Sequence, residues 1–243
     1  MPVNDELGKR MKIYYEQIPK AKLMRRTPVI IRIDGKAFHT FTKGFARPFD
    51  EILIKTMQET TKYLCENIQG CVLGYTQSDE LSLILVDYQR FETAAWFDYE
   101  IQKMCSIAAS MATMAFNKLF LDNVNEAYQE EVNELVQKDN IENNEEYAKL
   151  EVELKEKYNV YYDKVNMAMF DARVFNIPKE EVTNCIYWRQ LDAARNSVQM
   201  VGQANFSHKD YIVRLAVIFR ICLWNVKALT GIIFLHIRKE EPA

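Results

Sequence analysis

Three acidic residues stand where apolar segments of this sequence end. Asp34 follows the apolar run 28–33, and Asp79 and Glu80 lie between two further apolar segments. Carboxylate oxygens are preferred ligands of Mg²⁺, which uses its remaining positions for substrate phosphates. If the strands that end at Asp34 and Asp79 are neighbours, the two carboxylates can hold two metal ions for phosphoryl or nucleotidyl transfer.

The same residues are also compatible with two ordinary turns. The polar insert Thr76-Gln77-Ser78-Asp79-Glu80 separates the segments 71–75 and 81–86, and this pattern predicts a hairpin with a solvated turn. The position of Gly35 directly after Asp34 favours a ligand site, because glycine lets a backbone approach a ligand closely.

A polar loop over residues 34–49 follows the first apolar run. Its backbone N–H groups can face a triphosphate, and His39 or Arg47 can add charge-assisted hydrogen bonds. A loop histidine satisfied by its own backbone is the alternative for His39.

Charge is unevenly distributed along the chain, although the net charge of -3 does not itself indicate a nucleic-acid partner. Residues 20–47 contain Asp34 as their single acid among many Lys and Arg residues, whereas 122–156 is rich in Glu. A basic segment beside the acids suits phosphate groups, and a solvated surface explains it equally simply.

Hydrophobic periodicity predicts a core with the order strand, helix, strand, strand, helix, strand. This βαββαβ order is typical of an α+β fold, a split and mostly antiparallel sheet with helices on one face. The expected strands are 28–33, 71–75, 81–86 and 170–176, and the expected helices are 50–67, with Asp50 as its N-cap, 93–121, 178–183 and 184–200.

Three further segments lie outside this core. An amphipathic helix over 7–18 is expected to pack as a lid on the domain, and the Glu-rich insert 122–162 is expected to form one or two projecting helices. The insert suits an oligomer interface, since a negative surface repels phosphates. Residues 1–210 are thus assigned to one domain, and 211–243 to an atypical apolar C-terminal segment whose Lys and Arg residues argue against a membrane span.

The five cysteines are odd in number and show no CxxC spacing, so neither a zinc site nor a disulfide framework is indicated. Reduced thiols are typical of cytoplasmic proteins. Acidic residues near the N-terminus do not match a signal peptide. We therefore expect a cytoplasmic protein with no membrane partner.

Five ordered blocks carry a resemblance to a known family. The segment Arg32–His39 resembles the nucleotide-binding motif of the tRNA-His guanylyltransferase family, whose members add nucleotides to RNA 5′ ends in the 3′-to-5′ direction. The other matching blocks are 44–48, 74–80, 170–174 and 187–190. Five blocks in order are far more specific than any one of them.

The resemblance implies a palm-like domain related in fold to nucleotide polymerases and nucleotidyl cyclases. It implies two Mg²⁺ ions held by Asp34, Asp79 and the carbonyl of Gly35, with Glu80 orienting a metal-bound water. The nucleotide-binding residues that it implies are Gly35, Lys36, Ala37, Phe38, His39, Arg47, Ser78 and Lys103, and the RNA-binding residues are Arg189, Arg195 and Asn196. A plain helix-surface lysine is the alternative for Lys103.

One departure from the family pattern bears on the substrate. Members dedicated to tRNA-His carry His-Ile-Asn-Asn where this chain has Ala194-Arg195-Asn196-Ser197. Guanylyltransferase-like proteins of bacteria and archaea also lack that histidine, so the resemblance implies repair of truncated tRNA 5′ ends with ATP or GTP, by a homotetramer. The alternatives are addition of a guanylate at position -1 of tRNA-His, a nucleotidyl cyclase and a non-catalytic RNA-binding protein.

Overall fold

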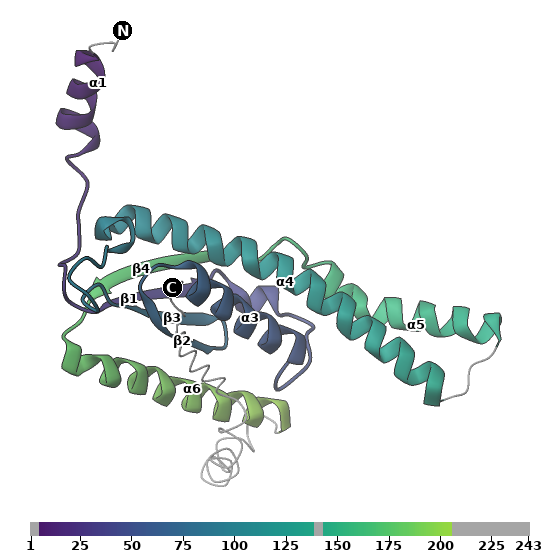
Figure 1. Cartoon of the computed structure of the whole chain (residues 1–243). Coiled ribbons are helices and arrows are strands. Elements are labelled where there is room, and N and C mark those ends of the chain that lie inside the picture. The colour runs from purple at the N-terminus through teal and green to yellow at the C-terminus, as the bar shows by residue number, and fades with distance from the viewer. Residues whose placement is uncertain (1–4, 139–142, 206–243) are drawn as a thin grey trace, which may run out of the picture.

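A four-stranded sheet forms the centre of the computed structural model, which describes residues 5–138 and 143–205 (Figure 1). Its strand order is β2-β3-β1-β4, and every neighbouring pair is antiparallel. The strands are β1 (Val29–Gly35), β2 (Cys71–Gln77), β3 (Glu80–Leu85) and β4 (Phe170–Asn176). The predicted α+β fold and its βαββαβ order are confirmed.

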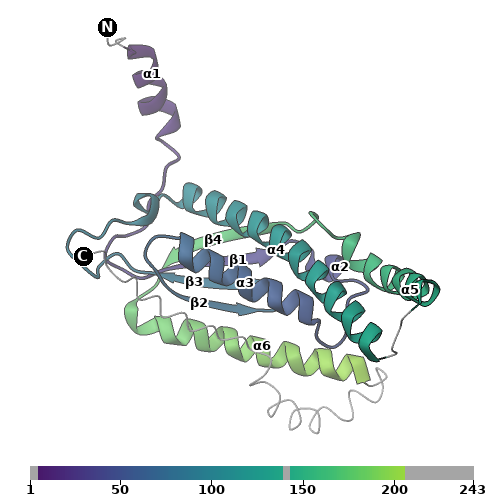
Figure 2. The ribbon, with the colours of Figure 1, turned by 45° about the vertical axis from the view of Figure 1, so that its right-hand side comes forward.

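The alternation of side chains along β1 divides the sheet into two unlike faces. Ile31 and Ile33 are fully buried in the main core, on the face covered by α3 (Glu51–Asn67) and α4 (Ile101–Lys138). Arg32 and Asp34 point to the other face. There α6 (Val182–Asn205) runs along the sheet on the side away from α4 (Figure 2), so one helix lies outside the expected single helical layer.

Helix α4 differs from its predicted bounds at both ends. It begins at Ile101, after a 3-10 turn at Trp96–Tyr99, and continues without a break to Lys138. Its second half pairs with α5 (Asn144–Tyr162) to form an arm that extends beyond the sheet (Figure 1). By length and composition α4 alone among the described helices could cross a membrane, but Ala108, Ala112 and Phe116 are buried in the domain core.

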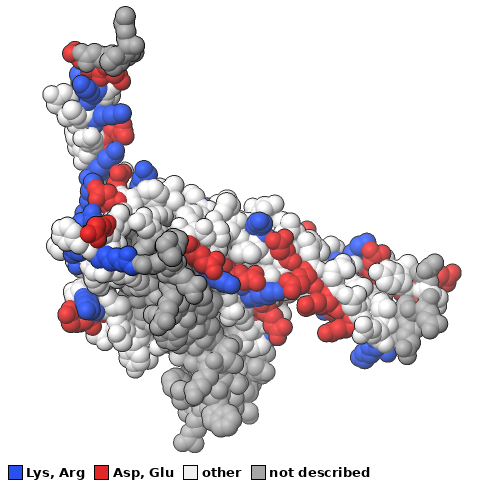
Figure 3. Space-filling view, viewed as in Figure 1, with Lys and Arg blue, Asp and Glu red and all other residues white. Residues whose placement is uncertain are grey.

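Acidic residues of the arm are accompanied by lysines. Lys157 Nζ lies 2.7 Å from Glu131 Oε2, and Lys55 Nζ lies 2.7 Å from Glu126 Oε2. Figure 3 shows Lys and Arg among the Asp and Glu side chains on this face. The surface of the arm therefore carries both positive and negative charges. Its role as an oligomer interface stays a prediction.

The prediction that the N-terminal helix packs as a lid is wrong. Helix α1 (Glu6–Met11) and the π-helical turn Lys12–Glu16 project away from the sheet (Figures 1 and 2). No residue of α1 is buried, and the apolar side chains Leu7, Ile13 and Tyr14 are exposed. The expectations for 211–243 concern residues outside the described part of the chain.

The connections after β1 and β4 contain short helical turns. Helix α2 (Phe38–Phe41) follows β1, and a 3-10 turn at Lys179–Glu181 precedes α6. The helix expected over 178–183 is thus only this turn, and α6 begins at Val182.

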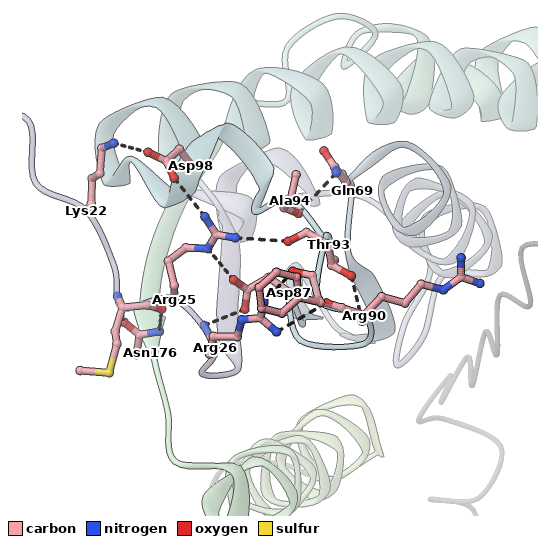
Figure 4. Close-up of polar contacts among 12 residues, drawn as sticks. Lys22, Arg25, Arg26, Gln69, Asp87, Arg90, Thr93, Ala94, Asp98 and Asn176 are labelled. Atoms are coloured by element: carbon pink, nitrogen blue, oxygen red, sulfur yellow. Dashed lines mark hydrogen bonds and ion pairs between the residues drawn. The ribbon is translucent and has the colours of Figure 1, made fainter.

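Part of the basic segment 20–47 serves the fold rather than a ligand. Asp87 is fully buried and accepts hydrogen bonds from Arg25 Nε (2.6 Å) and the backbone N–H of Arg26 (2.9 Å). Arg25 also donates to the carbonyl of Thr93 (3.2 Å) (Figure 4). These contacts fix the loop after β3 to the chain that enters β1.

We expect Asp87→Asn to lower the free energy of unfolding by about 2 kcal/mol, because hydrogen bonds to a buried charge are lost. Urea denaturation measures the change. Asp98→Asn is the control, because the Asp98 carboxylate also pairs with Arg25 but is 59% exposed and should leave the midpoint unchanged. Equal midpoints for the two variants would contradict the assigned role of Asp87.

Candidate functional site

The two acids of the hairpin turn have different environments. Strands β2 and β3 are joined through Ser78 and Asp79 alone, with Gln77 paired to Glu80 across the ladder. Ser78 has a φ of 50° and its hydroxyl donates a hydrogen bond to Asp79 Oδ1 (3.0 Å). The turn thus holds Asp79 at the sheet end, whereas Glu80 is part of β3.

Strand β1 brings Asp34 to the same end of the sheet. In the ladder Asp34 lies opposite Glu80 of β3 and opposite Asp171 of β4. The next residue, Gly35, donates its backbone N–H to the carbonyl of Asp79 (3.0 Å). Asp34 and Asp79 are therefore held together by the hydrogen bonds between neighbouring strands.

The electrostatics of Asp79 show that the acids are close. Burial raises the pKa of the Asp79 carboxyl, and the charge of Asp34 raises it further. The Ser78 hydroxyl and His39 act in the opposite direction without compensating fully. Burial is the largest cause of the raised pKa, and the charge of Asp34 is a smaller one.

Glycine is required at position 35 by packing. A Cβ added there would lie 2.3–2.7 Å from ring atoms of Phe38, closer than carbon atoms can approach. The ring of Phe38 is itself buried in the core between Phe41 and Phe116. The Asp-Gly sequence thus lets the chain turn tightly over a fixed aromatic side chain.

A cavity of about 560 Å³ opens at this end of the sheet, between α3 and α6. The β2–β3 turn contributes Ser78 and Asp79, and α6 contributes Asn196. Of the predicted site residues, those that line the cavity are Gly35, Ala37, Phe38, His39, Arg47, Ser78, Asp79 and Asn196. An apolar wall is formed by Phe45, Pro48, Phe49, Leu53, Ile54 and Met57.

Several predicted residues do not line this cavity. Asp34 is not among its lining residues, although its neighbour Gly35 is, and Lys36 is exposed and donates its backbone N–H to the carbonyl of Met169 (2.8 Å). Lys103 lies near the start of α4, with its ammonium 4.9 Å from the centre of the Phe97 ring. That end of α4 contacts Ala21, before β1, whereas the cavity lies where β1 ends. Lys103 therefore does not line this cavity, and its nucleotide-binding role stays a prediction.

Glu80 is held by two arginines rather than directed into the cavity. Arg32 Nη2 and Arg189 Nη2 each donate a hydrogen bond to Glu80 Oε2 (2.9 Å). Arg189 Nη2 also donates to Asp192 (2.8 Å), and its guanidinium lies 4.5 Å from the centre of the Trp188 ring. These contacts attach α6 to the sheet.

These contacts bear on two expected roles. The Glu80 carboxylate is held in ion pairs with Arg32 and Arg189, and its role in orienting a metal-bound water, or a group next to the metal ligands, stays a prediction. The Arg189 side chain is only 7% exposed, so in this position it is not available to an RNA backbone. Arg195, with a side chain that is 66% exposed, remains available for one.

Three residues of α6 besides Asn196, together with Asp50, are parts of the site that the sequence did not indicate. Ala193, Ser197 and Met200 of α6 line the cavity, as does Asp50, which was predicted only as a helix cap. The matching blocks 44–48 and 187–190 could have indicated these residues, because block 44–48 precedes Asp50 and block 187–190 precedes Ala193 in the sequence.

The site fits a divalent cation with oxygen ligands. The carboxylates of Asp34 and Asp79 are hard oxygen donors, and burial together with the nearby Asp34 charge raises the pKa of Asp79. Within the described residues no three His, Cys, Asp or Glu side chains converge to bind a metal. A Mg²⁺ site with few protein ligands and room for phosphate oxygens is consistent with that arrangement.

Comparison with known proteins agrees with this geometry. A family model described as tRNAHis guanylyltransferase (Thg1) matches residues 8–178. A bacterial tRNA(His) guanylyltransferase (Thg1)-like protein solved with ATP is 40% identical, with a TM-score of 0.64 over 84% of this chain and 72% of that one. Such a protein solved with GTP is also 40% identical, with a TM-score of 0.63 over 83% of this chain and 78% of that one.

Curated relatives match over shorter parts of their length. Uncharacterized protein R259 of Acanthamoeba polyphaga mimivirus is 28% identical over 81% of this chain and 62% of its own length. A probable tRNA(His) guanylyltransferase of Drosophila melanogaster is 34% identical over 36% of this chain and 30% of its own. This chain thus spans less than two thirds of either relative.

We expect saturating Mg²⁺ to stabilise the protein by about 1–2 kcal/mol, because only the folded state brings Asp34 and Asp79 together. Asp79→Asn should remove this increase and should leave the Mg²⁺-free protein no less stable, since a buried negative charge is lost. Thermal denaturation with and without Mg²⁺ measures both effects. Asp171→Asn is the control, because Asp171 is an exposed acid opposite Asp34 in the ladder. This variant should keep the Mg²⁺ response. A full Mg²⁺ response in Asp79→Asn would argue against the metal site.

Arg189 and Arg195 of α6 allow a matched test of the ion pairs that hold Glu80, of which Arg189 forms one. Arg189→Gln should lower the free energy of unfolding by about 3 kcal/mol, because a buried carboxylate loses one of its partners. Arg195→Gln should leave stability unchanged, because the Arg195 side chain is 66% exposed. Urea denaturation of the two variants measures the difference. The assignment is wrong if Arg189→Gln is as stable as wild type.

Proposed function

Because the chain belongs to the tRNAHis guanylyltransferase family, we propose that it is a nucleotidyltransferase that adds nucleotides to the 5′ end of truncated tRNA. The substrates are a tRNA with a 5′-monophosphate and nucleoside triphosphates. The growing end is the 5′ end, so the direction of synthesis is 3′-to-5′.

One observation carries the proposal: the loop that follows Asp34 and the turn that holds Asp79 line a single cavity. Its volume of about 560 Å³ lies in the range of small-molecule sites. Arg47 and His39 supply polar groups to the cavity, and Phe49 and Met57 are among its apolar lining residues. A triphosphate beside the acids and a base against apolar residues would use both kinds of lining.

The reaction has two transfers. In the first, an oxygen of the tRNA 5′-phosphate attacks the α-phosphorus of ATP or GTP, and pyrophosphate leaves. In the second, the 3′-hydroxyl oxygen of an incoming nucleoside triphosphate attacks the activated 5′-phosphorus, the nucleoside monophosphate leaves and the hydroxyl proton is released. The product is one nucleotide longer and carries a 5′-triphosphate.

The chain's own residues position and neutralise the reactants. Arg47 and His39 bind triphosphate oxygens, and the Ser78 hydroxyl orients Asp79 and can bind a phosphate. Asp34, Asp79 and the Gly35 carbonyl would hold Mg²⁺, which when bound polarises phosphates and lowers the pKa of an attacking hydroxyl. Arg195, exposed on α6, contacts the tRNA backbone.

Residues 194–197 support repair rather than addition dedicated to tRNA-His. They read Ala-Arg-Asn-Ser, without the histidine of His-Ile-Asn-Asn. Asn196 and Ser197 nevertheless line the cavity, so this segment is close enough to influence which 5′ end is accepted.

The decisive experiment incubates the purified protein with a 5′-monophosphorylated tRNA that lacks its first nucleotide, with Mg²⁺ and each nucleoside triphosphate in turn. We expect incorporation of the nucleotide that pairs with the opposite base of the acceptor stem. Asp79→Asn should lower the rate by on the order of a hundredfold or more, since several kcal/mol of charge stabilisation is lost. Asp171→Asn should retain activity.

Other outcomes would replace the proposal. Guanylate added to intact tRNA-His but not to truncated tRNA would indicate a dedicated guanylyltransferase. A cyclic nucleotide formed without tRNA would indicate a cyclase. Binding of tRNA without any incorporation, at all nucleotide concentrations, would indicate a binding protein.

A further inference from the structure

The arm formed by α4 and α5 contacts the loop that lines the cavity. Helix α5 ends at Tyr162, and the Tyr161 hydroxyl donates a hydrogen bond to Asp50 Oδ2 (2.6 Å). These two residues are 111 positions apart in the sequence. A residue of the arm is thus bonded to a residue that lines the cavity.

Asp50 connects Tyr161 to the cavity wall. Its Oδ2 also accepts the backbone N–H of Ala46 (3.0 Å), and its Oδ1 accepts that of Leu53 at the start of α3 (2.9 Å). The carboxylate therefore joins three elements, namely α5, the loop and α3. Ala46, Arg47, Pro48 and Phe49, which lie between the bonded positions, all line the cavity.

Packing contacts reinforce this connection. The rings of Phe45 and Tyr161 have centroids 4.7 Å apart. A Cβ added at Gly44, where φ is 97°, would lie 2.6 Å from a methyl group of Val160. The loop backbone therefore rests directly against the last turn of α5.

Aromatic contacts continue from Tyr161 into the arm. Tyr161 contacts Tyr158 at a centroid distance of 5.8 Å, and Tyr158 contacts Tyr128 of α4 at 5.4 Å. Tyr158 is buried and its hydroxyl donates to Glu131 (2.9 Å). The arm is thus packed along its length up to the point where Tyr161 meets Asp50.

We propose that Tyr161 is a positioning residue for nucleotide binding: through Asp50 it fixes the loop that carries Arg47 and the apolar wall of the cavity. This inference rests on the proposed function, because it assigns the cavity to a nucleoside triphosphate. The arm is then part of the nucleotide site, since it holds one wall in place without touching the ligand.

The neighbouring residue provides a matched control. Tyr162 is on the same turn of α5 and its hydroxyl donates to Asn125 (3.0 Å), within the arm and away from the cavity. Tyr161→Phe and Tyr162→Phe each remove one hydroxyl and keep the ring. Phenylalanine preserves the packing, so both variants should fold.

We expect Tyr161→Phe to raise the KM and the Kd for ATP and GTP about tenfold, since a hydrogen bond to a charged group is lost. The kcat should stay within about twofold, because the acids are untouched. Tyr162→Phe should match wild type in both constants. A purely structural role for Tyr161 would lower the thermal midpoint without this separation of KM from kcat.

Hydrogen exchange gives a readout that is independent of activity. Without nucleotide, backbone amides of residues 44–50 should exchange faster in Tyr161→Phe than in wild type or Tyr162→Phe, because Ala46 N–H is held less firmly. Equal exchange rates and equal Kd values for Tyr161→Phe and Tyr162→Phe would overturn the positioning role. If the wild-type protein still bound ATP or GTP, that result would leave the proposed function intact. A wild-type protein that binds neither ATP nor GTP would overturn both.

Discussion

The hydrogen-bond register between β1 and its two neighbours is the constraint on which the site depends. It places Asp34 opposite Glu80 and Asp171 and lets Gly35 bond to Asp79. A shift of one residue would turn Asp34 to the core face and Ile33 to the other. The core therefore helps to fix the acids, because Ile31 and Ile33 are fully buried and a one-residue shift would remove both from the core face.

The sheet and the acid pair could be predicted because their signals are local. Apolar or alternating segments marked all four strands, and Asp34 and Asp79 stood at strand ends in the sequence. The prediction that the N-terminal helix packs as a lid was wrong, because an amphipathic pattern does not identify the surface that its apolar face contacts. Ile13 and Tyr14 of this segment are exposed. The contact between Tyr161 and Asp50 could not be found, since two long helices (α3 and α4) and two strands (β2 and β3) separate these residues in the sequence.

The distribution of basic residues illustrates why charge is a weak guide to ligands. The segment 20–47 looked suited to phosphates, yet Arg25 and Arg26 bind Asp87 and Arg32 binds Glu80. Arg47 is the cation of this segment that lines the cavity, beside His39. Burying an acid within the fold needs a cation nearby, so a share of any basic segment is used by the protein itself.

The continuity of α4 limits which insertions and deletions the arm can accept. One helix runs from the sheet into the arm, so an insertion or deletion in its outer half would rotate everything beyond it by about 100° per residue. Only changes of about seven residues, or two turns, matched in α5, would keep the same side chains in register along the hairpin. The arm can therefore lengthen or shorten in such steps among homologues, while the end that meets Asp50 stays constant.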